Sequence, residues 1–143
     1  MNNLKVFLDR LVVEPDLQPR TYCNFGVFRV ANAFGCKTFD ARPLANTMCD
    51  ILAVSPAWTK ATGDEAHAAA NAGKFVLACK KAAGNGHIAT VYPSPQMYLS
   101  MSLAKHVPFV ANIGKNNDIM PVSQAFPPSK GEPDYYIWNG SGV

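Results

Sequence analysis

The chain has 143 residues, of which 48% are hydrophobic and 16% charged, a balance that excludes a disordered protein and suits one folded domain over residues 1–143. The formal net charge is only +3 and the basic residues are scattered, so nucleic-acid binding is not indicated. No apolar run approaches the roughly 20 residues that a membrane-spanning helix needs, and we expect no membrane span.

The first segment predicts a short helix. Apolar residues from Leu4 to Val13 recur at helical spacing, and the polar, proline-containing stretch 14–16 ends the pattern. Asp9 and Arg10 interrupt these apolar residues, so the segment lacks the unbroken apolar centre of a secretory signal. A protein of this kind that acts outside the cytoplasm would need a different export route.

The next helix is predicted over residues 23–34, where the apolar positions follow one helical face. Thr21 is placed to cap its start, and Gly35 is placed to end it in a left-handed conformation. Cys23 would then lie in the first turn. There, free backbone N–H groups and the helix dipole lower a cysteine pKa and favour the nucleophilic thiolate.

Two further helices follow. One is predicted from Pro43 to about Leu52. The residues expected to face inward from it are Leu44, Met48, Ile51 and Leu52. The other begins near Thr62 with a capping box over 62–65, and Gly73 closes its far end.

The period then changes to that of strands. Residues 75–79 form a short apolar run, 83–86 a turn, and 87–92 an alternating strand, which together predict a hairpin. Further strands are expected at 107–113 and, after a proline-rich loop, at 135–138 on the edge of the sheet. Helices first and strands later predict an α+β fold with a mostly antiparallel sheet.

The four cysteines show no Cys-x-x-Cys spacing, so neither a structural zinc site nor another metal or cofactor is expected. Cys36, Cys49 and Cys79 sit in apolar surroundings and are expected to be buried thiols. An even number of cysteines also permits two disulfides, and their state stays open.

His87 is the best candidate for a base. It opens a strand after a glycine-flanked turn, from which an imidazole can reach across to a helix end. His67 lies in an alanine-rich helical segment and His106 in a polar loop, and both are weaker candidates. A cysteine at a helix start and a histidine on a strand are also common structural residues, so spacing alone leaves the Cys23–His87 pair open.

The segments around these two residues resemble the NlpC/P60 and CHAP branch of the papain-like cysteine peptidases. Residues 22–27 read Tyr-Cys-Asn-Phe-Gly-Val, like the helix-opening cysteine motif, and 86–93 read Gly-His-Ile-Ala-Thr-Val-Tyr-Pro, like the Gly-His strand. Between them, residues 44–48, Trp58 and residues 70–74 follow in the same order as in phage and effector amidases of this type.

The resemblance covers roughly residues 20–115. It implies a papain-like single domain with N-terminal helices packed on the sheet, and a thiol hydrolase with Cys23 as nucleophile and His87 as general base. Relatives also carry a polar residue that orients the imidazole, and Asn112 is the candidate here, although it follows the histidine at a longer spacing than is usual. Asn112 could instead cap a turn. The lesser candidates are Ser94, Gln96 and Asp118.

The resemblance also implies an oxyanion-binding group at the backbone N–H of the nucleophile, with Tyr22 as a contributor. Trp58 and Tyr92 are expected either to line the cleft or to pack in the core.

The implied activity is hydrolysis of an amide in peptidoglycan stem peptides. The bond is either D-Glu–diaminopimelate or the D-Ala–diaminopimelate cross-link, which we favour. The chain is most like type VI secretion amidase effectors, made in the cytoplasm and delivered to a rival's periplasm, with a periplasmic immunity protein as partner. A phage endolysin, a non-catalytic binding module and a protein deamidase remain as alternatives.

Overall fold

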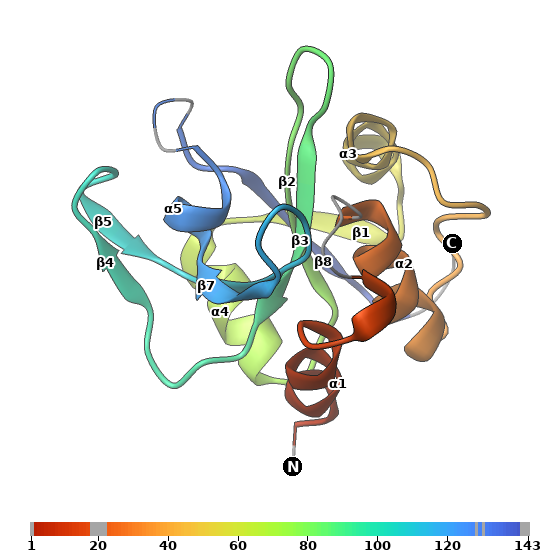
Figure 1. Ribbon diagram of the computed structural model, residues 1–143, viewed down its shortest axis with the longest axis horizontal. Helices are drawn as coiled ribbons and strands as arrows, with labels where there is room; N and C mark the ends of the chain where they lie inside the picture. The colour runs from red at the N-terminus through yellow and green to blue at the C-terminus, as the bar shows by residue number, and fades with distance from the viewer. Residues whose placement is uncertain (1, 18–22, 128, 130, 141–143) are drawn as a thin grey trace.

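A computed structural model describes residues 2–17, 23–127, 129 and 131–140. They form a mixed α and β domain in which a central antiparallel sheet carries helices on both faces (Figure 1). This confirms the α+β class and the mostly antiparallel sheet. No helix among the described residues has the length and apolar character required to cross a membrane.

The main sheet has six strands in the order β1-β8-β2-β3-β6-β7, and every neighbouring pair is antiparallel. Its strands are β1 (Trp58–Ala61), β2 (Val76–Lys80), β3 (His87–Tyr92), β6 (Phe109–Asn112), β7 (Asp118–Pro121) and β8 (Asp134–Trp138). A separate two-stranded hairpin contains β4 (Tyr98–Ser100) and β5 (Lys105–Val107). The helices are α1 (Asn3–Leu11), α2 (Cys23–Ala33), α3 (Ala45–Val54), α4 (Gly63–Asn71) and the short α5 (Val122–Ala125), with a 3-10 turn at Pro15–Leu17.

The predicted helix ends are present. Gly35 has φ of 72°, and the Cys36 N–H donates to the Ala31 carbonyl at 2.8 Å, which closes α2 with a left-handed cap. The capping box of α4 is complete, because the Thr62 N–H donates to Glu65 and the Glu65 N–H donates to Thr62. Gly73, with φ of 86°, ends the same helix.

Two predictions about local position are wrong. Leu44 precedes α3 and is 67% exposed, because the helix begins one residue later and turns that side chain to solvent. The strand predicted over 107–113 is interrupted at Pro108, which has no N–H to donate, so β5 ends at Val107 and β6 starts at Phe109.

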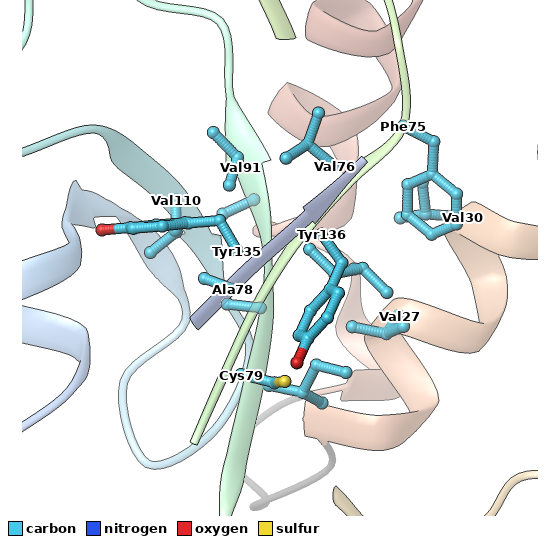
Figure 2. Close-up of a cluster of buried hydrophobic side chains, with 14 of the residues drawn as sticks. Val27, Val30, Phe75, Val76, Ala78, Cys79, Val91, Val110, Tyr135 and Tyr136 are labelled. Atoms are coloured by element: carbon cyan, nitrogen blue, oxygen red, sulfur yellow. The ribbon is translucent and has the colours of Figure 1, made fainter. Parts of the chain in front are cut away.

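The prediction that the last strand lies at the sheet edge is also wrong. β8 lies between β1 and β2, with Trp58 opposite Trp138 and Leu77 opposite Tyr136. A central strand is covered on both faces, and Figure 2 shows Tyr135 and Tyr136 pointing to opposite sides of the sheet. Burial of both tyrosines explains why this strand reads as a continuous apolar run instead of an alternating one.

The largest part of the core lies between α2 and the sheet. Val27 and Val30 of α2 face Cys79 and Tyr136 of the central strands (Figure 2). On the opposite face, Gly63 at the start of α4 lies against Tyr135. The sheet is therefore fixed between α2 and α4, and the start of α2 is held in a defined position beside it.

Candidate active site

A pocket of about 570 Å³ lies where several elements end together. Its walls come from the start of α2, the first turn of α3, the turn between β2 and β3, the end of β6 with the turn after it, and α5. The β2–β3 turn and α3 lie at the same end of the molecule, at the top of Figure 1. Cys23, His87 and Asn112 all line this pocket.

Gly26 allows α2 to bring Cys23 to the pocket. A methyl group at position 26 would lie 2.6 Å from Cγ1 of Ile113, so only glycine permits this approach of α2 to the end of β6. Asn24 holds the other side of the same helical turn, because its Nδ2 donates to the Pro43 carbonyl at 3.1 Å. The first turn of α2 is thus fixed between β6 and the segment that leads into α3.

The sulfur of Cys23 lies against the first residues of β3. It accepts a hydrogen bond from the backbone N–H of Ile88, the residue that follows His87. The nucleophile and base candidates, 64 positions apart in the sequence by their numbers, are therefore neighbours across the pocket.

His87 owes its position to the start of β3, where it pairs with Lys80. The turn before it is held by Asn46 of α3, whose Nδ2 donates to the Ala82 carbonyl at 2.9 Å and whose Oδ1 accepts from the Ala82 N–H at 3.2 Å. A methyl group at Gly86 would collide with the Asn46 amide oxygen and lie 2.7 Å from the Lys80 carbonyl oxygen. Glycine is therefore required directly before the histidine.

Asn112 fixes the imidazole of His87. Its Nδ2 donates to the Asn116 carbonyl at 2.7 Å, which leaves its Oδ1 to face the ring, 2.6 Å from Nε2. Since Oδ1 can only accept, Nε2 carries the proton, and in the neutral ring Nδ1 is the unprotonated nitrogen. Phe126 packs against the imidazole with ring centroids 4.8 Å apart.

The electrostatics favour a neutral pair. Burial lowers the pKa of His87, and the hydrogen bond to Asn112 opposes this shift. Burial also raises the pKa of Cys23, and it outweighs the backbone hydrogen bonds to the sulfur, which act in the opposite direction. The N–H groups at the helix start do lower the Cys23 pKa as predicted, but the expected net direction is wrong, because desolvation of a thiolate costs more here than these N–H groups return.

The remaining site candidates are Tyr22, Trp58 and Tyr92, of which the structure describes the last two. Tyr22 falls outside the described residues, as does the expected cap Thr21. Trp58 and Tyr92 do not line the pocket. Trp58 is buried against Phe75 and donates to Thr38 at 2.8 Å, so it serves the core. Tyr92 lies at the far end of β3, where its hydroxyl donates to Asp9 at 2.6 Å.

The weaker candidates are also outside the pocket. His67 lies on α4 next to Asn71, and His106 is exposed on β5. Among the alternatives to Asn112, the Ser94 hydroxyl donates to the Gln96 carbonyl at 2.7 Å, and Asp118 accepts from the Ile119 N–H at 2.8 Å. None of these side chains lies beside the imidazole.

The pocket includes residues that had no sequence signal of their own. Lys115 and Gln124 come from a turn and the short α5, and neither falls in a recognisable motif. Asn46, at the start of α3, lies in the 44–48 segment that follows the resemblance, but nothing in that segment indicated a pocket residue. The run Gly-Lys-Asn-Asn at 114–117 has the composition of a turn and gives no further signal. Cys36, Cys49 and Cys79 are buried free thiols away from this pocket.

The pocket can support nucleophilic acyl chemistry. It contains a thiol, an imidazole whose proton-accepting nitrogen is defined, and a neutral carboxamide that holds the ring. No three His, Cys, Asp or Glu side chains of the described residues are grouped so as to hold a metal ion. No protein-family model matches the sequence, and a search of curated proteins found no match.

Proposed function

We propose that this chain is a papain-like thiol hydrolase of the NlpC/P60 and CHAP type that cleaves an amide bond in peptidoglycan stem peptides. Cys23 is the nucleophile, His87 the general base and Asn112 the residue that orients the base. One observation carries the proposal: the 2.6 Å bond from His87 Nε2 to Asn112 Oδ1 lies on the wall of a pocket that Cys23 also lines.

The reaction begins from the neutral pair. As Cys23 Sγ attacks the carbonyl carbon of the scissile amide, His87 Nδ1 takes the thiol proton, and the carbonyl electrons move onto oxygen. We assign stabilisation of this oxyanion to the first backbone N–H groups of α2, which have no partner within the helix. A thiol with a raised pKa makes the base necessary, because little free thiolate exists before substrate binds.

The intermediate collapses with cleavage of the carbon–nitrogen bond. Protonated His87 gives its proton to the leaving amine, and a thioester remains on Cys23. Water then attacks the thioester while His87 accepts a proton from it. The acid leaves, and the sulfur recovers its proton from His87. Throughout, Asn112 keeps Nε2–H occupied and so leaves Nδ1 as the nitrogen that exchanges protons.

The lining suits a peptide. Carboxamides of Asn46, Asn85 and Gln124 offer donors and acceptors for backbone amides, and Leu44 and Met120 add apolar contacts. The choice of peptidoglycan comes from the resemblance in the motifs around Cys23 and His87. Of the two candidate bonds we favour the D-Ala–diaminopimelate cross-link over D-Glu–diaminopimelate.

In the biological setting that we propose, the protein is a type VI secretion effector. It is made in the cytoplasm, delivered to the periplasm of a target bacterium, and blocked in its producer by an immunity protein that fills the pocket. A phage endolysin with the same chemistry is the runner-up. Gene neighbourhood separates the two, because an effector is encoded beside its inhibitor and an endolysin beside lysis genes.

The test is hydrolysis of purified sacculi, with mass spectrometry of the released muropeptides to identify the bond. We expect wild-type protein to release peptides and Cys23→Ala to release none while keeping its fold by circular dichroism. Cys36→Ala is the matched control, since Cys36 is a buried thiol outside the pocket. Full activity of Cys23→Ala would end the assignment.

The raised Cys23 pKa favours one second candidate, a non-catalytic binding module on the same fold. The pH dependence of iodoacetamide labelling distinguishes the two. In the hydrolase, labelling of Cys23 at neutral pH depends on His87 and falls in His87→Ala. In the binding module, Cys23 reacts only at alkaline pH, and His87→Ala changes nothing. If the protein releases no peptides from sacculi but its Cys23 labelling depends on His87, the result would instead point to a protein deamidase.

A further inference from the structure

The pocket carries a single formal charge. Among the described residues that line it, Lys115 is the one lysine, and no arginine, aspartate or glutamate is present. Because the lowered pKa of His87 favours its neutral form, the positive charge of the pocket comes from Lys115. No carboxylate among the described lining residues compensates this charge. Such a cavity attracts anionic groups and repels cationic ones.

Lys115 is also unpaired. Four other lysines form ion pairs with carboxylates, at 3.0 Å, 3.6 Å, 2.7 Å and 2.9 Å for Lys5, Lys60, Lys81 and Lys105. Lys115 forms no ion pair with any residue in the part of the chain that the structure describes, and it is an exposed residue of the pocket lining. Its ammonium is available for a ligand.

The backbone that carries Lys115 is held beside the reacting groups. The N–H of Gly114 donates to Asn117 Oδ1 at 2.8 Å, and Asn117 Nδ2 donates to the Leu17 carbonyl at 2.9 Å. A methyl group on Gly114 would lie 3.5 Å from Cε1 of His87, so the residue before Lys115 lies against the imidazole. The backbone next to Lys115 is thus fixed against the imidazole of the base.

We propose that Lys115 binds the free carboxylate of the residue that flanks the scissile amide, and so selects peptides that carry this carboxylate over peptides in which it is amidated. This inference rests on the proposed function, whose substrates have carboxylates next to both candidate bonds. The ammonium donates charge-assisted hydrogen bonds to the carboxylate at the pocket wall. Amidation removes the charge and leaves only a neutral contact.

The experiment uses two synthetic stem peptides that differ only in this group, one with the free carboxylate and one with the primary amide. The ratio of their kcat/KM values is measured for wild type, Lys115→Met and Lys115→Arg. We expect wild type to prefer the acid by about 10-fold to 100-fold, the range of a hydrogen bond to a charged group. Lys115→Met should bring the ratio close to one, and Lys115→Arg should keep the preference.

Lys74→Met is the matched control, because Lys74 is an exposed lysine outside the pocket without an ion pair among the described residues. Its ratio should equal that of wild type. A wild-type ratio near one, or an equal loss for both peptides in Lys115→Met, would overturn the inference.

Calorimetric titration of both peptides into Cys23→Ala separates this inference from the proposed function. Lys115-dependent binding of the acid without hydrolysis by wild type would keep the carboxylate site and end the hydrolase. Hydrolysis with no difference between acid and amide would keep the hydrolase and end the carboxylate site. Absence of both binding and hydrolysis would overturn the two together.

Discussion

The two ends of β3 each carry a polar ring, and they differ in what surrounds it. At the start of the strand, His87 faces a pocket and contacts the neutral carboxamide of Asn112. At the other end, Tyr92 donates its hydroxyl proton to Asp9, and Lys5 lies 5.7 Å above its ring. In Figure 1 the first end lies near α3 and the second beside α1.

The difference shows what makes a polar side chain available for chemistry. Tyr92 has one donor, which Asp9 uses, and Lys5 completes a closed group that fastens α1 to the sheet. His87 has two ring nitrogens, of which Asn112 engages one, and the residue itself lines the pocket. A partner that adds no charge also keeps the imidazole neutral, as a base must be. The hydrogen bond of Tyr92 therefore stabilises the fold, whereas the hydrogen bond of His87 orients the imidazole.

The largest effect is expected from removing the polar group at each end of β3, the imidazole of His87 or the hydroxyl of Tyr92. His87→Ala should lower hydrolysis by about 10³-fold or more, because the base that receives the thiol proton is lost. Tyr92→Phe should leave hydrolysis within about twofold and lower the free energy of unfolding by roughly 1.5–3 kcal/mol, the value of one hydrogen bond to a charged group. Rates on sacculi and urea unfolding of both variants check this. Equal losses of activity would show that the two ends do not differ in function.

Changing the hydrogen-bond partners of His87 and Tyr92 should give smaller effects, again on activity at the first end of β3 and on stability at the other. Asn112→Ala frees the imidazole to rotate and should lower kcat by about 10-fold to 100-fold with little change in KM, a loss of orientation. Asp9→Asn, which leaves Tyr92 a neutral acceptor, should cost stability and spare kcat. Steady-state kinetics on a soluble stem peptide separates the parameters. A rise in KM alone in Asn112→Ala would assign Asn112 to substrate binding instead of orientation.

The smallest effect concerns pH and stability. The pKa of folded His87 lies below the ordinary 6.5, so in acid the unfolded chain binds this proton first. The free energy of unfolding should therefore fall as the pH drops below 6.5 toward the folded pKa, by at most about 1.4 kcal/mol per pH unit for one group. His87→Gln should show a shallower decline between pH 7 and pH 5 in urea titrations. A steeper decline in the variant would contradict the lowered pKa.

The same shift sets an expectation for catalysis that the sequence did not give. A base with a lowered pKa stays unprotonated below pH 6.5, so the acid limb of the rate profile lies at lower pH than that of an ordinary histidine. From the pattern alone, we predicted a thiol that ionises easily at a helix start. Whether a helix start or a buried environment dominates depends on the elements packed over the sulfur, and these come from distant parts of the chain.

Local sequence patterns determined the helices and the hairpin. The apolar face of 23–34, Gly35 and the capping box at Thr62 act over a few neighbouring residues, and the structure contains each of them. The strand predicted at 87–92 is also present, although it is buried continuously from Ile88 to Tyr92 instead of on alternate residues. These patterns also placed a cysteine at a helix start and a histidine at a strand start. Both positions depend only on where an element begins.

Tertiary structure alone decided the order of the strands, the lining of the pocket and the environment of Cys23. It put β8 inside the sheet between β1 and β2, Trp58 and Tyr92 away from the pocket, and Asn46 and Lys115 in the lining that they share with His87. It also reversed the expected direction of the Cys23 pKa. The physical reason is that strand order, desolvation and the walls of a cavity depend on contacts between residues far apart in the chain, which no short-range periodicity encodes.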